Sequence, residues 1–143
     1  MRLTVDTDVV VAAVRSPTGA SAALLALLLE GKASWLLSVA MAFEYEAICM
    51  LAEHRLAANA SEREIRNLLD TIFGTIVPVE VHYQWRPQLT DAGDEMVLEA
   101  AVNGRADAIV TFNGAHFKGA RPGDSASNCG SQRKHYGRLR NDT

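Results

Sequence analysis

Short apolar runs of the strand type alternate with longer segments of helical pattern along most of the chain. The strand-like runs are residues 2–5, 34–38, 75–81 and 106–111. Helical patterns cover residues 9–14, 20–30, 39–53, 61–73 and a segment that follows Asp94 and ends at Asn103 and Gly104. Alternating strands and helices predict a parallel sheet covered by helices, so we expect a three-layer α/β/α fold with about four to five strands.

Several residues indicate where these elements begin, end or lie in the sheet. Ser61 and Glu64 form a capping-box pattern at the start of a helix, and Gly31 marks the end of another. Pro78 lacks a backbone donor, which favours an edge position for its strand. The helix at residues 20–30 is apolar on all sides, so we expect it to be buried or to lie in a protein interface.

The composition predicts a globular protein of ordinary size. The chain has 143 residues, of which 48% are apolar and 22% are charged, and this balance is typical of one folded domain. The longest apolar stretch, residues 20–29, is shorter than the roughly 20 residues of a membrane span, and no signal-peptide pattern follows Met1. We therefore expect a cytoplasmic protein without membrane contact. Cys49 and Cys129 lie far apart and form neither a metal motif nor a disulfide framework.

Charge is divided unevenly along the chain. Five basic against two acidic residues give residues 119–143 a net charge of +3, whereas nine against fifteen give residues 1–118 a net charge of −6. The last segment is also almost without apolar residues, so burial cannot repay the entropy cost of ordering it. We therefore expect a folded domain over residues 1–118 and a basic, flexible tail over residues 119–143.

Acidic side chains follow the predicted strands where these strands end. They are Asp6 and Asp8 after the first strand, Glu44 and Glu46 on the helix after the second, and Asp91 and Asp94 before the fourth, with Asn113 following the fourth. Because the carboxyl ends of parallel strands share one edge of a sheet, these carboxylates would meet there. Such a cluster repels itself unless it binds a hard cation, so it predicts a Mg²⁺ or Mn²⁺ site.

A divalent ion held by carboxylates suggests a particular chemistry, because it can activate water and stabilise an in-line displacement at phosphorus. Hydrolysis of nucleic acid is therefore the leading hypothesis. Glu44 and Glu46 lie two positions apart on a helix and face different ways, and we expect Glu44 to be the ligand. Asp94 alone is also explained as a helix cap, whereas Asp6, an acid that ends a buried strand, requires a further reason.

Three segments, in this order, resemble the PIN domain family, and in particular its toxin ribonucleases from type II toxin–antitoxin systems. The segments are VDTDVVVAAVRSPTGAS at residues 5–21, SVAMAFEYEAICML at 38–51 and DAGDEMVLEAAVNGRADAIVTFNGAHF at 91–117. Each segment presents an acidic residue where the family has one. The likeness covers residues 1–118 and implies a Mg²⁺-dependent (or Mn²⁺-dependent) endoribonuclease, with RNA as substrate, an antitoxin as partner and a homo-oligomeric state.

The resemblance also implies which residues act. Asp6 matches the first acid of the family, Glu44 the glutamate on a helix, and Asp94 the acid of the later helix, and these three would be catalytic. The metal set would comprise these three together with Asn113, Asp91 and Asp8. The family commonly has an acid where this chain has Asn113, so metal affinity should be lower unless Asp8 or Asp91 restores the charge.

Two alternative functions remain open from the residues alone. Residues 5–9 (VDTDV) also fit a phosphohydrolase of the haloacid dehalogenase type, with Asp6 as nucleophile and Asp8 as acid/base. Such an enzyme requires a lysine at a strand end, and no lysine of this chain lies convincingly in such a place. The other alternative is a binding module with a weakened acidic site, in which the apolar helix at residues 20–29 contacts a partner.

Overall fold

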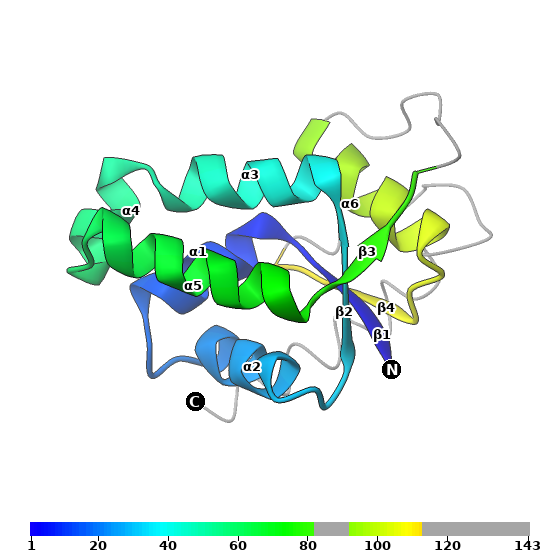
Figure 1. The fold of residues 1–143 in the computed structure, drawn as a ribbon, viewed down its shortest axis with the longest axis horizontal. Coiled ribbons are helices and arrows are strands. Elements are labelled where there is room, and N and C mark those ends of the chain that lie inside the picture. The colour runs from blue at the N-terminus through cyan, green and yellow to red at the C-terminus, as the bar shows by residue number, and fades with distance from the viewer. Residues whose placement is uncertain (82–91, 113–143) are drawn as a thin grey trace.

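A four-stranded parallel sheet forms the centre of the fold (Figure 1). The computed structural model describes residues 1–81 and 92–112, without the side chains of residues 92–94. The strands are β1 (Arg2–Val5), β2 (Ser34–Ser38), β3 (Val77–Val79) and β4 (Ala108–Val110). Their order in the sheet is β3-β2-β1-β4, and every pairing is parallel. All four strands therefore end at the same edge of the sheet.

Six helices flank this sheet. They are α1 (Thr7–Arg15), α2 (Ala20–Leu29), α3 (Val39–Cys49), α4 (Ala52–Ala58), α5 (Glu62–Thr75) and α6 (Ala92–Asn103). Helix α6 packs against β1, β2 and β4, whereas α1 packs against α2, α3 and α4 (Figure 1). The expected three-layer α/β/α fold is confirmed, with four strands within the described residues.

The local signals for element ends act as expected. The Ser61 side chain accepts a hydrogen bond from the backbone N–H of Glu64, and the reciprocal half of the capping box is also formed. Gly31 has φ +81°, a left-handed conformation that suits glycine after a helix. Pro78 lies in β3, at the edge of the sheet next to β2, where the missing N–H costs no ladder hydrogen bond.

The prediction of a single helix over residues 39–53 is wrong, because the helix that starts at Val39 ends at Cys49 and a second helix starts at Ala52. Met50 ends α3 and Leu51, with an extended backbone, precedes α4. The Arg55 guanidinium donates to the Met50 carbonyl oxygen over 3.1 Å, which satisfies one of the acceptors that the helix end leaves open. The break lets α4 lie against α1, which a straight continuation of α3 would not permit.

The position of Asp94 in its helix differs from the prediction. Helix α6 begins at Ala92, so Asp94 belongs to its first turn rather than preceding it, and nothing is described of its side chain. Asp91 and Asn113 lie outside the described residues, as does the whole segment 119–143. The predicted tail therefore stays a prediction.

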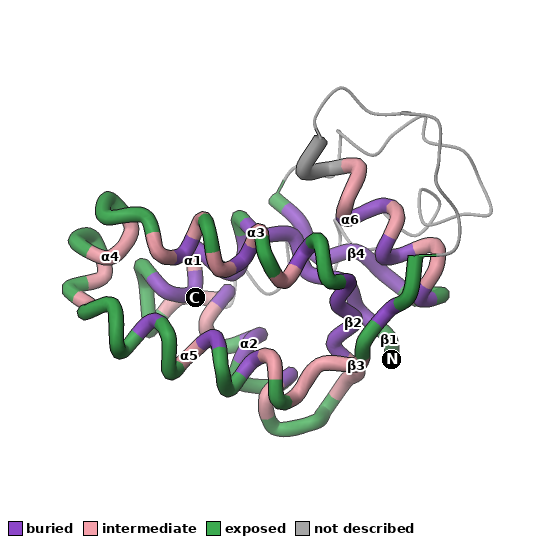
Figure 2. Tube along the Cα trace, turned by 45° about the horizontal axis from the view of Figure 1, so that its top comes forward, coloured by how far each residue is buried: buried purple, intermediate pink, exposed green. Residues whose placement is uncertain are grey.

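Burial follows the layers, with buried residues along the strands and on the inner faces of the helices (Figure 2). The largest side chains that are fully buried include Trp35 and Tyr45. Helix α2 buries Leu24, Leu25 and Leu28, although Leu27 is 44% exposed. Within residues 1–81 and 92–112, no single helix has the length and apolar character for a membrane crossing, and only the bent pair α1 and α2, with 107° between them, meets both criteria together.

Candidate metal centre

Asp6 lies at the carboxyl end of β1 and immediately before α1. Its side chain is almost fully buried, with 7% of the residue exposed, and it makes no capping hydrogen bond to α1 although it occupies the N-cap position. The Thr111 hydroxyl instead donates to Asp6 Oδ2 over 2.8 Å. The carboxylate is therefore held by the sheet and directed away from the usual role of a helix cap.

The pairing of β1 with β4 explains why Thr111 reaches Asp6. Val5 is the register partner of Val110, so the next residue of each strand lies at the same edge. The backbone N–H of Asp6 continues the ladder by donating to the Val110 carbonyl oxygen over 2.9 Å. Thr111 is itself buried, and its hydroxyl is thus a fixed, neutral donor to the carboxylate.

Glu44 is carried by α3, which starts directly after β2. The Ser38 side chain accepts from the backbone N–H of Met41 over 3.3 Å and so caps this helix. Glu44 is partly buried in the second turn. Strand β2 ends at the same edge of the sheet as β1, and the capped helix α3 follows it directly. Glu44 therefore lies on a helix that starts at the edge where Asp6 lies.

Tyr45, the next residue of α3, connects the elements that carry the two carboxylates. Its ring is fully buried, and its hydroxyl donates to the Val5 carbonyl oxygen of β1. Trp35 of β2 donates from Nε1 to the same hydroxyl over 3.4 Å. The two rings also contact each other in a tilted arrangement, with centroids 6.2 Å apart.

The electrostatics of Tyr45 link Asp6 to Glu44. Burial raises the pKa of the Tyr45 phenol far above its ordinary value, and the charges of Asp6, Cys49 and Glu44 raise it further, against a lowering by the Trp35 hydrogen bond. The phenol therefore keeps its proton near neutral pH and acts as a donor there. Asp6 follows β1 and Glu44 precedes Tyr45 on α3, so the two carboxylates lie on the two elements that the Tyr45 hydroxyl joins.

The other predicted acids lie elsewhere or are not described. Glu46 faces Arg66 of α5, with 3.5 Å between Oε1 and Nη1. Asp8 is exposed in the first turn of α1, where its negative charge interacts favourably with the helix dipole. Helix α6, which carries Asp94, packs against β1 and α3. Asp6 directly follows β1, and Glu44 lies on α3.

The described residues hold no group of three or more His, Cys, Asp or Glu side chains that could bind a metal ion. Asp6 and Glu44 still provide two carboxylates, one of them buried and hydrogen-bonded by a neutral hydroxyl. Mg²⁺ is commonly bound through one or two carboxylates and completes its shell with water and substrate oxygens. The donors present therefore fit a hard divalent cation and do not suit a soft one.

Cys49 does not contribute to this chemistry. It is buried at the end of α3, and burial raises the pKa of its thiol to about 11. Near neutral pH it is a protonated thiol that behaves as a small apolar side chain.

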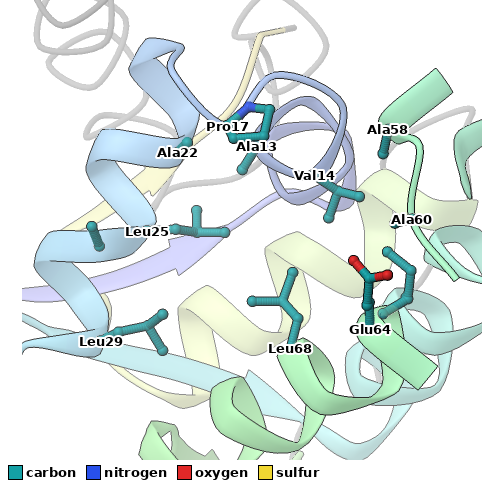
Figure 3. Close-up of a pocket in the computed structure, with 12 residues that line it drawn as sticks. Ala13, Val14, Pro17, Ala22, Leu25, Leu29, Ala58, Ala60, Glu64 and Leu68 are labelled. Carbon is teal, nitrogen blue, oxygen red and sulfur yellow. The ribbon is translucent and has the colours of Figure 1, made fainter. Parts of the chain in front are cut away.

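A pocket of about 360 Å³ lies in a different part of the molecule, between α1, α2 and the segment from α4 to α5 (Figure 3). Its wall is almost entirely apolar, with Leu25 and Leu29 of α2 facing Leu68 of α5, and Glu64 is its charged side chain. Helix α1 contributes Ala13 and Val14, which lie at the opposite end of this helix from Asp6. The pocket is therefore separate from the carboxylates.

Sequence patterns missed two residues of the carboxylate region. Thr111 stands at the end of a strand as Asp6 does, and its polar side chain there was the available signal. Tyr45 fits the spacing of a core residue on its helix, and only the fold shows that its hydroxyl reaches β1.

The protein is of the α/β/α class, with a parallel sheet and a buried acid, Asp6, at the carboxyl edge of that sheet. A family model described as PIN domain matches residues 2–115, so the chain belongs to the PIN domain family. It has the nuclease-type fold of this family, and members of the family generally use divalent metal ions. No curated protein and no solved structure matches the chain significantly.

Proposed function

We propose that the protein is a divalent-metal-dependent endoribonuclease that hydrolyses phosphodiester bonds of RNA. The observation that carries this proposal is the buried Asp6 carboxylate, held by Thr111 at 2.8 Å. Glu44 lies on α3, the helix that Tyr45 ties to the strand end before Asp6. In a PIN domain this pairing at the carboxyl edge of the sheet is suited to a metal ion. Burial of the Asp6 carboxylate costs stability, and a bound cation would offset that cost.

Asp6, Glu44 and Asp94 are the residues that we propose to hold the ion, which we expect to be Mg²⁺ or Mn²⁺. When bound, such an ion lowers the pKa of water and stabilises negative charge at phosphorus. Thr111 fixes one oxygen of Asp6 and so orients the other. Asp8, exposed nearby in the sequence at the start of α1, adds negative potential that favours the cation.

Asn113 and Asp91 complete the proposed set on the strength of the family resemblance alone. An amide binds a cation through its carbonyl oxygen but contributes no charge. We therefore propose that Asn113→Asp shifts the Mg²⁺ dependence of cleavage to lower concentration, by roughly tenfold, as changes around a metal site commonly do. Cleavage rates measured across a Mg²⁺ titration would detect this shift, and an unchanged midpoint would exclude Asn113 from the site.

A phosphohydrolase that uses Asp6 and Asp8 is the weaker alternative. It would need the Asp8 carboxylate to work beside Asp6, whereas Asp8 is exposed on the surface of α1 and Asp6 is buried. The family of the chain also favours a nuclease. Small phosphate monoesters would be hydrolysed under this alternative and not under ours.

We further propose that the enzyme is a toxin, restrained by a protein antitoxin in the cytoplasm, and that it forms a homo-oligomer. The apolar pocket of Figure 3 supports a protein partner, because Leu25, Leu29 and Leu68 line it and Glu64 supplies one negative charge. An antitoxin with apolar side chains next to a basic residue would be complementary to it. Ala26 of α2 is an exposed residue of the pocket wall, so Ala26→Glu should abolish co-purification with the antitoxin while RNA cleavage by the purified protein is retained.

RNA cleavage in defined metal conditions tests the enzymatic proposal. Purified protein is incubated with structured and unstructured RNA in Mg²⁺, in Mn²⁺ or in chelator, and products are resolved on a denaturing gel. We expect internal cleavage in either metal and none in chelator. Absence of any metal-dependent product, with RNA bound intact, would instead favour the binding module.

A further inference from the structure

We propose that Tyr45 is a positioning residue of the metal centre, whose hydroxyl holds the Asp6 carboxylate in place through the peptide group that precedes it. This inference rests on the proposed function and adds a residue that touches neither metal nor RNA. It starts from one peptide group, the one that joins Val5 to Asp6 at the end of β1.

Both polar atoms of this peptide group are fixed, by two different elements. Its carbonyl oxygen, on Val5, accepts from the Tyr45 hydroxyl of α3. Its N–H, on Asp6, donates to the Val110 carbonyl oxygen of β4 over 2.9 Å. Because a peptide group is planar, restraint at both atoms fixes its orientation. The position of the Asp6 Cα, from which the side chain starts, is fixed with it.

The contact of Tyr45 also lies where the pairing of β1 with β2 ends, although the pairing of β1 with β4 continues there. The pairing of β1 with β2 is recorded from Arg2 to Thr4, so Val5 stands one residue past that register. A side chain from α3 supplies the hydrogen bond there. Tyr45 thereby ties α3, which carries Glu44 one residue earlier, to the strand end that carries Asp6.

Trp35 shows that the hydroxyl, rather than only the ring, has a role. A buried phenylalanine would fill the same volume without bringing a polar atom into the core, which is costly unless it is hydrogen-bonded. In this protein the hydroxyl both donates to β1 and accepts from Trp35 Nε1 of β2. The three elements β1, β2 and α3 are thus joined at one oxygen atom.

Removal of the hydroxyl should loosen the Val5–Asp6 peptide group without opening a large cavity. Asp6 would then sample orientations that do not converge with Glu44. Residues that orient metal ligands commonly change metal affinity by about 10 to 100-fold. We expect the lower end of this range for Tyr45→Phe, because the N–H of Asp6 stays bonded to β4.

Mn²⁺ binding to the full chain tests this role directly. Free Mn²⁺ is measured by electron paramagnetic resonance during titration of wild type, Tyr45→Phe and the control Ile72→Val. Ile72 is also fully buried, on α5, so this control removes one methylene from the core elsewhere. Tyr45→Phe should bind Mn²⁺ about tenfold more weakly and cleave RNA with a lower kcat at an unchanged KM, whereas Ile72→Val should match wild type in all three values.

The outcomes separate this inference from the proposed function. If wild type binds Mn²⁺ and cleaves RNA but Tyr45→Phe does both equally well, Tyr45 has only a packing role and the inference is overturned. If wild type binds no Mn²⁺, the proposed metal centre fails and the role of Tyr45 fails with it. Should Tyr45→Phe not fold, as judged by circular dichroism, the hydroxyl is needed for the fold as a whole, and the inference of a positioning role at the metal centre is overturned.

Discussion

The two ends of strand β1 differ in how their charged residues are satisfied. At the amino end, the Arg2 guanidinium donates to the Gly104 carbonyl oxygen over 3.0 and 2.8 Å. The backbone N–H of Arg2 donates to the Asp107 carboxylate over 2.7 Å. The Arg2 guanidinium thus binds the carbonyl oxygen at the end of α6, and the Asp107 carboxylate binds a backbone N–H. Each charged group is therefore bound by a group of opposite polarity.

The carboxyl end instead gathers groups of the same sign. Asp6 is buried there and receives a neutral hydroxyl from Thr111, and Glu44 acts on the same phenol as Asp6 does. A buried carboxylate is disfavoured in its charged form, and the cation of the proposed metal centre would stabilise that form. The comparison teaches that the charged groups at the amino end of β1 contribute to stability, whereas we propose that those at its carboxyl end serve a ligand.

The largest effect should come from removal of the Asp6 charge. Asp6→Asn keeps the shape and the position of the side chain, so we expect RNA cleavage to fall by about 100-fold or more as a ligand is lost. Its melting temperature in chelator should be equal to or above that of wild type, because repulsion with Glu44 is relieved. Cleavage assays and thermal melts with and without Mg²⁺ measure both. Wild-type activity at equal metal concentration would show that the carboxyl end is not a metal centre.

Glu44 and Glu46 form a matched pair on α3 that sharpens the comparison. Glu44→Gln should lower cleavage by about tenfold or more, since it removes a proposed ligand. Glu46→Gln should retain activity, because it removes an exposed ion pair with Arg66 of the kind that contributes less than about 1 kcal/mol to stability. The opposite ranking of the two variants in a cleavage assay would reverse the assignment.

A change at the amino end should affect stability and leave catalysis intact. Arg2→Met keeps an apolar stem but removes both donors to the Gly104 carbonyl oxygen. We expect a loss of about 1 kcal/mol or somewhat more in the free energy of unfolding, the usual cost of an unsatisfied acceptor that is partly buried. Urea denaturation measures the loss, and kcat should be unchanged. A fall in kcat at full folding would mean that the two ends are coupled.

The smallest effect concerns Glu99 of α6, a carboxylate outside the proposed centre. Burial and the nearby Glu95 raise its pKa above the ordinary 4.5, so folding disfavours its charged form and stability falls as pH rises through that pKa. Glu99→Gln should therefore raise the free energy of unfolding at pH 7 by less than about 1 kcal/mol, since solvent screens this partly exposed group. The gain should vanish below about pH 4 and be independent of Mg²⁺. A metal-dependent gain in thermal melts would place Glu99 within the centre.

The sequence predicted those parts of the fold that depend on neighbouring residues. The capping box of Ser61 and Glu64, the turn at Gly31 and the edge strand with Pro78 are local signals, and all three are confirmed. The break between α3 and α4 has no such signal, because residues 50 and 51 continue an apolar helical pattern. In the fold α4 packs on α1, a contact between distant residues that the local pattern does not predict.

The candidate site divides in the same way. Asp6 was identifiable as an acid that ends a buried strand, since few other reasons explain a carboxylate there. The contact of Thr111 with Asp6 depends on the register of β1 with β4, and that of Tyr45 with Val5 depends on where α3 crosses β1. Neither register nor crossing can be inferred from residues that lie 105 and 40 positions apart.

Anomalous scattering from crystals grown with Mn²⁺ tests the central claim most directly. The claim is that Asp6 and Glu44 belong to one divalent cation site at the carboxyl edge of the sheet. We predict an anomalous peak with an Asp6 carboxylate oxygen in its first coordination shell and Glu44 bound directly or through one water molecule. A fully occupied Mn²⁺ ion bound elsewhere, with Asp6 and Glu44 unchanged and without metal, would contradict the account.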